Sequence, residues 1–449
     1  MALMISVSGI RGIFGTDLTP ENLTRFTAAY GSWLEGGTVV VGRDTRASGP
    51  LCEQVVTAAL RAVGCEVIRV GVATTPTVAM AVLSHGANGG IVISASHNPA
   101  EWNALKLLNE KSEFLDAGQG EEVIARSESR DLAWKPYDAI GGEREDPGAL
   151  EHHINSILDL PYIDPDVITA AGFRVALDPV NGTGAVAFPP LLERLGVQTV
   201  AVNDEPNGRF AHNPEPLPEH LQQICALVRE EQCDLGIVTD PDGDRLALVT
   251  DRGEPFGEEY TQAAAFDFML AKNPGPCATN LSSSRVAEDV AARYGQPCHR
   301  SAVGEINVVK KMQQTGAVIG GEGNGGVINP DLHYGRDALV GAAMVLQLLA
   351  EREVSASDYR AGLPDYHMRK SRISLEEVDG DALLQRALDH YADREPDTLD
   401  GVKIDFEEGW VHLRKSNTEP ILRVYSEGPT PDAAREVAEG VIAAITSGS

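Results

Sequence analysis

Three stretches of the chain share one pattern of apolar and polar residues. In each, a β-branched apolar run precedes a loop of Gly, Ser, Asp, Asn and Arg residues, and the spacing of an amphipathic helix follows; the stretches are 38–50, 173–185 and 276–288. Each helix pattern closes on a glycine, after which a second apolar run begins. Strand, loop, helix and strand in this order are typical of βαβ units with parallel strands. In the first unit, Ser48 is positioned to cap the helix and Pro50 lies in its first turn.

The last part of the chain has a different pattern. Two helices and two short strands are predicted there, at 381–391, 410–413, 421–426 and 431–445. Thr430 is expected to cap the final helix. This mixture predicts a smaller α+β domain after three related α/β domains. The expected domain spans are residues 1–150, 151–255, 256–368 and 369–449.

The composition indicates a globular protein without a membrane span. Of the 449 residues, 43% are apolar and 23% are charged, and the glycines and prolines are spread along the chain. No apolar stretch is long enough to cross a bilayer. The N-terminal residues lack the positive segment and the cleavage site of a signal peptide. We therefore expect a cytoplasmic location and no membrane partner.

The charge balance argues against nucleic acid as a partner. The 37 basic and 66 acidic residues give a formal charge of -29, which repels phosphate backbones over most of the surface. The six cysteines are scattered without a C-x-x-C pair, so we expect buried thiols rather than a zinc site or a disulfide framework. An acidic protein that binds an anionic ligand must concentrate positive charge locally. The candidates for this charge are Arg11, Arg43, Arg46 and Arg245, which lie in predicted loops.

A serine loop follows the apolar run GGIVI. In SASHNP, Ser96 stands at the tip of a predicted turn and is followed by His97, so its hydroxyl is expected to be exposed as a nucleophile requires. An ordinary Ser/Asn turn is the alternative. No G-x-S-x-G elbow surrounds the serine, which disfavours an acyl-transfer hydrolase. Nearby, Lys106 lies in an apolar segment that can partly desolvate it, unless it snorkels along the surface.

A loop with three aspartates, DPDGDR, follows the apolar run DLGIVT. Asp240, Asp242 and Asp244 alternate along a Pro/Gly turn, so their carboxylates can converge on one hard cation such as Mg²⁺. Three carboxylates this close repel one another without a counter-charge. The alternative is a hairpin turn with solvated aspartates. An EF-hand is excluded because Arg245 stands where that loop needs its glycine.

Two further loops carry polar side chains among glycines or between strands. In GGEGNGG, the glycines let the backbone approach a ligand, and Glu322 and Asn324 are the side chains that can bind the hydroxyls of a polyol. No Walker lysine follows, so a P-loop is rejected. The segment from RKSNTEP onward offers a phosphate cradle of side chains and backbone N–H groups, with Arg414, Ser416, Asn417, Thr418 and Arg423. A plain glycine-rich turn and a polar hairpin tip are the alternatives.

Taken in this order, the loops resemble those of the α-D-phosphohexomutase family over essentially the whole chain. SGIRG is similar to that family's N-terminal active-site loop, SASHNP to its phosphoserine loop, DPDGDR to its magnesium loop, GEGNGG to its sugar loop and RKSNTEP to its phosphate loop. The resemblance implies three related α/β domains with mixed sheets that surround a central active-site cleft together with the C-terminal domain. In chain order, the domains would carry the phosphoserine, the metal, the sugar and the phosphate of the substrate.

The resemblance also implies an isomerase that moves a phosphoryl group within a hexose phosphate. Ser96 would carry the phosphoryl group and pass it to the sugar, which becomes a bisphosphate before it returns a phosphate to Ser96. Mg²⁺ would be held by Asp240, Asp242, Asp244 and an oxygen of the Ser96 phosphate. Glucose 1,6-bisphosphate or an equivalent hexose bisphosphate would act as activator.

The same resemblance assigns the remaining side chains. Lys106 would be the general acid or base at the sugar hydroxyl, and the other residues expected in the catalytic set are Arg11, His97 and Arg245. Glu322 and Asn324 would hold the 3- and 4-hydroxyls of the sugar. The non-reacting phosphate would be held by Arg414, Ser416, Asn417, Thr418 and Arg423.

Departures from the family pattern bear on the choice of hexose. Many members have Ser and His where this chain has Asn324 and Gly326, and many have His where Glu305 stands. These features resemble the archaeal-type branch, in which phosphoglucosamine, phosphogluco- and phosphomannomutase activities all occur. Glu305 and Glu322 can meet a sugar ammonium, although glutamates also bind neutral sugars. The sequence favours a phosphoglucosamine mutase, with a phosphoglucomutase/phosphomannomutase as the alternative.

Two hypotheses from other classes stay open at this point. A Mg²⁺-dependent sugar-phosphate phosphatase would use Asp240 as nucleophile, but Asp244 then replaces the usual small residue, and Ser96 and Lys106 have no role. A non-catalytic sugar-phosphate sensor would bind the ligand and need neither of these two side chains. For the assembly, both a monomer and a homodimer agree with the sequence.

Overall fold

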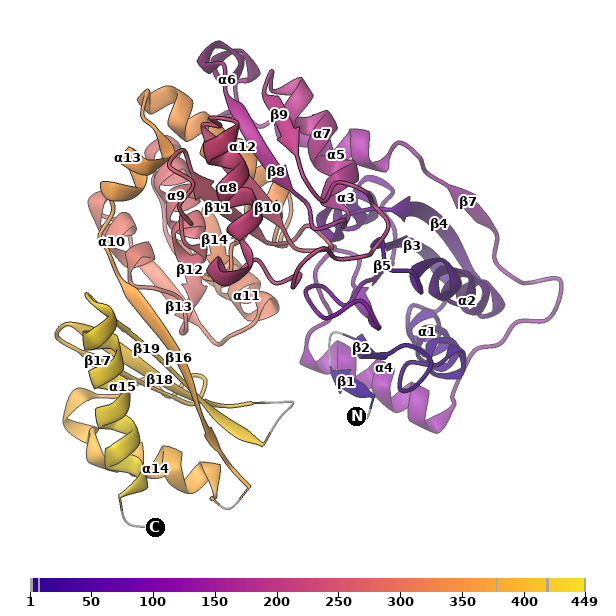
Figure 1. The fold of residues 1–449 in the computed structure, drawn as a ribbon. Coiled ribbons are helices and arrows are strands. Elements are labelled where there is room, and N and C mark those ends of the chain that lie inside the picture. Colours follow the sequence, from indigo (N-terminus) through magenta and orange to yellow (C-terminus); the bar gives the residue numbers. More distant parts are fainter. Residues whose placement is uncertain (1–2, 7–8, 377, 417–419, 448–449) are drawn as a thin grey trace.

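The computed structural model describes residues 3–6, 9–376, 378–416 and 420–447. Four modules follow one another along the chain, and each contains its own sheet. Figure 1 shows them in an arc, from the indigo N-terminal module to the yellow C-terminal module. Among the described helices, none combines the length and the apolar character needed to span a membrane.

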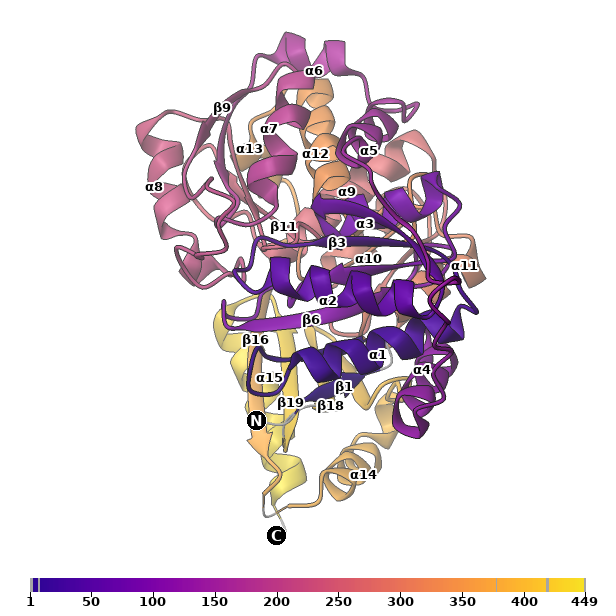
Figure 2. The same cartoon turned by 90° about the vertical axis from the view of Figure 1, so that its right-hand side faces the viewer.

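The first module is a seven-stranded sheet with helices on both faces. It contains β1 (Met4–Ser6), β2 (Gly9–Ile13), α1 (Pro20–Trp33), β3 (Gly37–Arg43), α2 (Gly49–Ala62), β4 (Cys65–Val72), α3 (Thr75–Ser84), β5 (Gly89–Ile93), β6 (Trp102–Leu108), α4 (Ala117–Ser129) and β7 (Glu143–Glu145). The strand order is β1-β2-β6-β5-β3-β4-β7, and β2 and β6 run antiparallel to their neighbours. Because side chains alternate along β3, Val39 and Val41 share a core with α1 and α2, whereas Val40 packs with α3. Figure 2 shows α1 and α2 in front of this sheet.

The second and third modules are smaller versions of this arrangement. The second contains α5 (Ala149–Leu158), α6 (Pro165–Ala171), β8 (Arg174–Asp178), α7 (Gly184–Arg194), β9 (Gln198–Ala201), η1 (Pro218–His220), α8 (Gln222–Glu230), β10 (Leu235–Thr239) and β11 (Leu246–Thr250). The third contains α9 (Glu258–Lys272), β12 (Cys277–Asn280), α10 (Val286–Arg293), β13 (Cys298–Ser301), α11 (Glu305–Thr315), β14 (Ile319–Glu322), β15 (Gly326–Ile328), α12 (Ala338–Arg352) and α13 (Ala356–Ala361). Their sheet orders are β11-β10-β8-β9 and β13-β12-β14-β15. In each sheet, one edge strand, β11 or β15, is antiparallel and the other three strands are parallel.

The fourth module is an antiparallel sheet covered by helices. It contains β16 (His367–Ser374), α14 (Gly380–His390), η2 (Ala392–Arg394), β17 (Val402–Phe406), β18 (Gly409–Lys415), β19 (Ile421–Gly428) and α15 (Pro431–Thr446). The strand order is β16-β19-β18-β17. Thr430 begins α15 as predicted, because its hydroxyl accepts a hydrogen bond from the backbone N–H of Ala433 at 3.1 Å. The module has a hydrophobic core of its own between the sheet and both helices.

The predicted βαβ repeat is confirmed. Each of the units β3–α2–β4, β8–α7–β9 and β12–α10–β13 places two parallel strands side by side. Together with the mixed sheets and the α+β fourth module, this repeat confirms the predicted fold class. One local expectation is wrong: Ser48 lies at the N-cap of α2, but its hydroxyl makes no capping bond. The hydroxyl instead accepts a hydrogen bond from the side-chain amide of Asn103 at 2.9 Å. A tertiary contact thus replaces the local capping bond.

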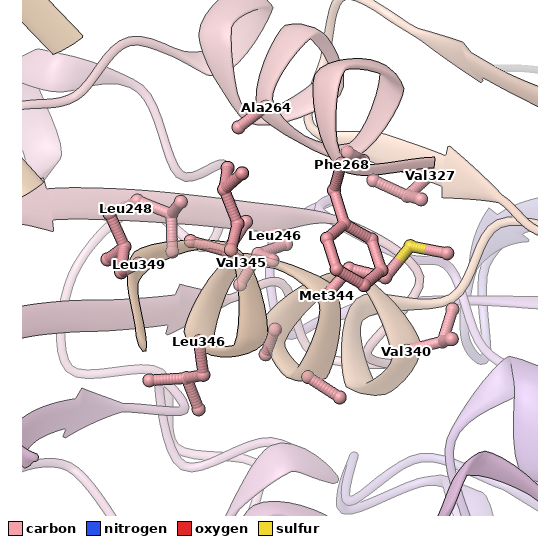
Figure 3. Packing of buried hydrophobic residues seen from close by; sticks show 14 of the residues in the cluster. Leu246, Leu248, Ala264, Phe268, Val327, Val340, Met344, Val345, Leu346 and Leu349 are labelled. Carbon is pink, nitrogen blue, oxygen red and sulfur yellow. The ribbon is translucent and has the colours of Figure 1, made fainter. Parts of the chain in front are cut away.

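The second and third modules share one hydrophobic core. Side chains of α12 pack in the same cluster as Leu246 and Leu248 of β11 and Phe268 of α9, and Figure 3 shows these residues around α12. Burying a side chain such as Leu or Phe contributes about 2 kcal/mol, so a core of this size holds the two modules together strongly. The shared core therefore fixes the end of β10 relative to the end of β14, where two of the candidate loops lie.

Candidate active site

One cavity of about 670 Å³ is lined by side chains from all four modules. Ser96, after β5, and Glu322, at the end of β14, both line it. So do Arg414 of β18 and Arg245, which directly precedes β11. Parallel strands present their carboxyl ends at one edge of a sheet, which explains why loops far apart in the chain meet here. The central cleft that the family resemblance implies is therefore present.

Ser96 is held in a strained turn that faces this cavity. Its φ of 48° is in the left-handed region, and its backbone N–H donates to the hydroxyl of Ser94 at 3.0 Å. The fully buried guanidinium of Arg46 donates to the carbonyl oxygens of Ser96 (2.6 Å) and Asn98 (2.7 Å) and so fixes the loop. The expectation of an exposed hydroxyl is wrong, because only 4% of Ser96 is accessible and the loop is drawn inward. Its side chain is reached through the cavity instead.

The three aspartates lie directly behind Ser96. DPDGDR is indeed the turn of the β10–β11 hairpin, but its carboxylates are fully buried rather than solvated. Ser96 Oγ donates to Oδ2 of Asp240 at 2.7 Å, and one oxygen from each aspartate lies within 4.8 Å of the other two. Among the described residues, Oδ1 of Asp242 and Oδ1 of Asp244 have no hydrogen-bond partner. Buried anionic oxygens without donors are suited to a hard divalent cation.

The electrostatics of this triad agree with that fit. Burial and the neighbouring Asp244 and Asp242 raise the pKa of Asp240 well above its ordinary value. Burial also acts to raise the pKa of Asp242, but its contacts with Lys106 and Thr75 outweigh this and leave the pKa low. The triad therefore combines a carboxyl whose pKa is raised, that of Asp240, with one that hydrogen bonds hold ionised, that of Asp242.

Lys106 supplies a positive charge beside the metal loop. It lies on β6, where the expected desolvation is confirmed because only 8% of the residue is exposed. Its Nζ donates to Oδ2 of Asp242 at 2.6 Å and to Oδ2 of Asp244 at 3.3 Å. Burial alone would lower the pKa of Lys106, but the two carboxylates raise it above its ordinary value. The amine is therefore protonated in this arrangement and lines the cavity as a potential proton donor.

Arg336 is a site residue that the sequence analysis missed. It directly precedes Asp337, the N-cap of α12, and its guanidinium donates to Asp244 (2.7 Å), Glu305 (2.8 Å) and Glu322 (3.0 Å). One buried cation thus connects the metal loop with the sugar loop. The signal that could have found it is the segment YGRDAL, in which an arginine stands between a glycine and the Asp337 N-cap of a long apolar helix.

Three further predicted residues surround Ser96. Arg11 of β2 donates to Oδ1 of Asn98 at 2.7 Å, and Arg245 donates to Oε1 of Glu215 at 3.2 Å. The Nδ1 of His97 lies 3.3 Å from Oγ of Ser96. Burial together with Arg245 and Arg11 lowers the pKa of His97 to about 2, so its imidazole is neutral.

The predicted charge cluster is only partly correct. Arg11 and Arg245 line the cavity, whereas Arg43 and Arg46 do not. Arg43 pairs with Glu53 at 3.0 Å, and Arg46 pairs with Asp44 at 2.9 Å. Arg46 therefore supports the serine loop, and Arg43 pairs with a carboxylate of α2, so neither meets a ligand in the cavity.

Two acidic side chains face the cavity near the sugar site, Glu322 of the sugar loop and Glu305 at the start of α11. Oε1 of Glu322 accepts hydrogen bonds from the side-chain amide of Asn280 (2.9 Å) and the backbone N–H of Gly304 (3.2 Å). Burial raises the pKa of Glu305, and the nearby Arg336 opposes this. Asn324 lines the same cavity and turns its Oδ1 toward the N–H of Gly326 at 3.2 Å.

The phosphate loop of the fourth module reaches the same cavity through Arg414 and Arg423. Arg414 pairs with Asp400 at 2.8 Å, and Arg423 donates to the hydroxyl of Ser416 at 3.4 Å. The predicted Asn417 and Thr418, like Ser8 in the first loop, lie outside the described residues. His412, which was not predicted, also lines the cavity and contacts the hydroxyl of Ser282 at 2.8 Å.

Comparison with known proteins assigns the chain to a family. Four models of the phosphoglucomutase/phosphomannomutase family match it: α/β/α domain I at residues 3–133, domain II at 151–253, domain III at 257–366 and the C-terminal domain at 373–444. A Methanopyrus kandleri protein named "Probable phosphoglucosamine mutase" is 35% identical and aligns over 97% of this chain and 96% of its own length. A Thermococcus kodakarensis protein named "Phosphoglucomutase/phosphomannomutase" is 34% identical over 98% and 97%.

The fold agrees with a solved structure of the same family. A phosphoglucomutase/phosphomannomutase family protein from Burkholderia thailandensis superposes with a TM-score of 0.85, at 26% identity, over 99% of both chains. The four-module fold with its shared cavity defines a phosphohexomutase, an isomerase that transfers a phosphoryl group. The chain belongs to the phosphoglucomutase/phosphomannomutase family.

Proposed function

We propose that this chain interconverts hexose 6-phosphate and hexose 1-phosphate through a phosphoserine at Ser96, and that its hexose is glucosamine. The observation that carries the proposal is the 2.7 Å contact between Ser96 Oγ and Asp240 Oδ2 at the wall of the common cavity. This contact places a hydroxyl nucleophile at a carboxylate cluster that also holds a protonated lysine. Phosphoryl transfer depends on such positioning and charge stabilisation.

Mg²⁺ would be held by Asp240, Asp242 and Asp244, with an oxygen of the Ser96 phosphate as a further ligand. The unpartnered Oδ1 atoms of Asp242 and Asp244 support this assignment. When bound, the cation neutralises charge on the phosphoryl group during transfer. Asp240 would exchange its hydrogen bond from the Ser96 hydroxyl for metal ligation once Ser96 carries phosphate.

The transfer step uses groups that face the same cavity. The bond between phosphorus and Ser96 Oγ breaks while a bond to a sugar oxygen forms, and the proton of that sugar hydroxyl must leave. Lys106, which is protonated, would release its proton toward the Ser96 oxygen as that oxygen leaves phosphorus and would accept the proton of the sugar hydroxyl, and the reverse step would return both protons. Arg11 and Arg245 would stabilise the phosphoryl oxygens, since Arg11 contacts Asn98 of the serine loop and Arg245 lines the same cavity as Ser96. His97, which stays neutral, would orient the Ser96 side chain.

Substrate orientation would depend on the two remaining loops. Glu322 and Asn324 would bind sugar hydroxyls, whereas Arg414, Arg423 and Ser416 would hold the phosphate that does not react. Asn417 and Thr418 complete this proposed phosphate site. The bisphosphorylated sugar then turns around within the cavity, so that either phosphate can face Ser96. A hexose bisphosphate, such as glucose 1,6-bisphosphate, would prime the serine.

The preference for glucosamine rests on the acidic wall of the sugar site. Glu305 and Glu322 share the single cation Arg336, so the site retains an excess of carboxylate that favours a substrate ammonium. Relatives of nearly equal identity carry the phosphoglucosamine mutase and the phosphoglucomutase/phosphomannomutase names.

A coupled mutase assay tests both parts of the proposal. Glucosamine 6-phosphate, glucose 1-phosphate and mannose 1-phosphate are compared in Mg²⁺ with a hexose bisphosphate primer. We expect the highest kcat/KM for glucosamine phosphate, and Glu305→Gln should lower that value more than the value for glucose 1-phosphate. Glu110→Gln, at an exposed position, is the matched control. Release of inorganic phosphate without isomerisation would instead indicate a phosphatase.

A further inference from the structure

A second cluster of metal-ligating side chains lies where three modules meet. His153 lies on α5 of the second module, and His333 and Asp337 lie between β15 and α12 of the third. One donor atom from each residue lies within 4.8 Å of the other two. Thr77, on α3 of the first module, contacts the cluster through its hydroxyl, which lies 3.0 Å from Nδ1 of His153. Among the described residues that line the active-site cavity, His153, His333 and Asp337 do not appear.

The hydrogen bonds of this cluster do not satisfy His333. Nε2 of His153 lies 2.8 Å from Oδ2 of Asp337, which is a good hydrogen bond. Nε2 of His333 reaches the same oxygen only at 3.4 Å, and its Nδ1 has no partner among the described residues. The His333 side chain is 1% exposed, so water does not compensate from the surface. The observation that bears on a ligand is the long contact of Nε2, because an ion between the two imidazoles and the carboxylate would give this buried nitrogen a good partner.

The donor atoms have the chemistry and the spacing of a transition-metal site. Two imidazoles and one carboxylate form a donor set found in zinc proteins, and they prefer Zn²⁺ or Co²⁺ to Mg²⁺. Ligand atoms around a tetrahedral Zn²⁺ are separated by about 3.3 Å, close to the observed 2.8 and 3.4 Å. A small adjustment of the side chains therefore admits the ion.

The surroundings orient two of the three ligands. The Thr77 hydroxyl holds Nδ1 of His153, which points Nε2 toward Asp337. Oδ1 of Asp337 caps α12 by accepting the N–H groups of Leu339 (2.8 Å) and Val340 (3.3 Å), and Oδ2 is left for the ligand. These outer contacts match those that orient the ligands of metal sites in proteins.

We propose that His153, His333 and Asp337 form a second metal site, specific for Zn²⁺ or a similar transition metal and separate from the Mg²⁺ site. Its ion would connect α5 with the start of α12. Because Asp337 follows Arg336 directly, the ion would also hold that arginine in position at the active site. The role is structural, and three protein ligands leave one coordination position for a further ligand.

Metal binding to the full chain in excess Mg²⁺ tests this proposal. Mg²⁺ fills the aspartate triad, so Co²⁺ added to the stripped protein reports the second site by its visible absorption, and elemental analysis gives the stoichiometry. We expect one tightly retained Co²⁺ or Zn²⁺ per chain. With Mg²⁺ present in both samples, the protein with added Zn²⁺ should unfold at a temperature at least about 2 °C higher than the protein treated with the chelator 1,10-phenanthroline.

Four variants distinguish ion binding at the proposed site from ion binding elsewhere on the chain. His333→Gln should lose the retained ion and the effect of Zn²⁺, while His333→Cys, which restores a donor atom, should bind it again. Asp240→Asn, in the other cluster, and His212→Gln, at a histidine paired with Asp178, should keep the ion.

Two results would overturn the proposal. The first is a wild-type chain that retains no Co²⁺ in excess Mg²⁺. The second is a His333→Gln variant that retains as much Co²⁺ as the wild type. If His333→Gln does not fold, the number of Co²⁺ ions retained per chain by the wild type and by Asp240→Asn still tests the proposal.

Discussion

Arg336 lies 2.7 Å from Asp244, although the two residues belong to different modules and are far apart in the sequence. The same guanidinium also pairs with Glu305 and Glu322, so it connects the metal loop with the sugar loop. None of these four side chains is more than 11% exposed. Burial strengthens their mutual attraction relative to a surface pair. The charge state of the metal site and the geometry of the sugar site are thereby coupled through one residue.

Replacing Arg336 should destabilise the protein and disturb the active site. Arg336→Gln leaves Glu305 and Glu322 without their cation and Asp244 with Lys106 alone, and breaking a buried pair typically costs about 3 to 5 kcal/mol. We expect a fall in the unfolding temperature by about 5 °C or more, partly reversed by Mg²⁺, together with a higher KM. Arg252→Gln is the control, because that arginine forms an exposed pair with Asp358 and should change stability by less than about 0.5 kcal/mol. An unchanged unfolding temperature and KM in Arg336→Gln would refute this role.

Mg²⁺ binding should release a proton. Burial, Asp244 and Asp242 raise the pKa of Asp240, but a metal ligand must be ionised. The affinity for Mg²⁺ should therefore increase as the pH rises through the pKa of Asp240. Calorimetry in buffers with different ionisation heats measures the released protons, and Asp240→Asn should weaken binding and remove its pH dependence. An affinity that does not change with pH, without proton release, would contradict this expectation.

His212 should stabilise the fold only at lower pH. Burial acts to lower its pKa, but the hydrogen bond to Oδ2 of Asp178 at 3.0 Å outweighs this and raises the pKa above its ordinary value. The contact between His212 and Asp178 therefore stabilises the folded state fully below the pKa of the unfolded chain, about 6.5. This stabilisation is lost as the pH rises through the pKa of His212 in the folded protein. His212→Gln should lower the unfolding temperature at pH 6 by more than at pH 9. The exposed His152→Gln is the control, and an equal loss at both pH values in His212→Gln would argue against this account.

Local patterns predicted the elements better than the contacts between them. The three βαβ units and the helix that Thr430 caps depend on signals a few residues apart, and all are present. Ser48 carries the same capping signal, but Asn103, far along the chain, binds its hydroxyl instead. Ser96 was expected at an exposed turn, yet Arg46 pulls that loop inward through backbone carbonyls. Local sequence does not determine which distant group competes for a polar atom.

The candidate site was predictable to the extent that its residues stand in motifs. The serine, aspartate and glycine-rich loops each concentrate unusual residues in a short segment. Ser96 and Glu322 line one cavity, and Asp240 contacts Ser96 from behind. Arg336 and His412 stand singly between ordinary elements, so only the folded arrangement reveals their contacts. The pairing of Arg43 and Arg46 with nearby carboxylates was also invisible, because a loop arginine gives no indication of its partner.

The central claim is that Ser96 carries the phosphoryl group, and its phosphorylation state tests that claim most directly. The wild-type chain is incubated with glucose 1,6-bisphosphate and Mg²⁺, and intact mass and peptide mapping then locate any added phosphoryl group. We expect one group on Ser96, which the hexose monophosphate substrate removes, and a Ser96→Ala variant that gains none and turns over at least about 10³-fold more slowly. A phosphoryl group on an aspartate, or full activity in Ser96→Ala, would contradict the account.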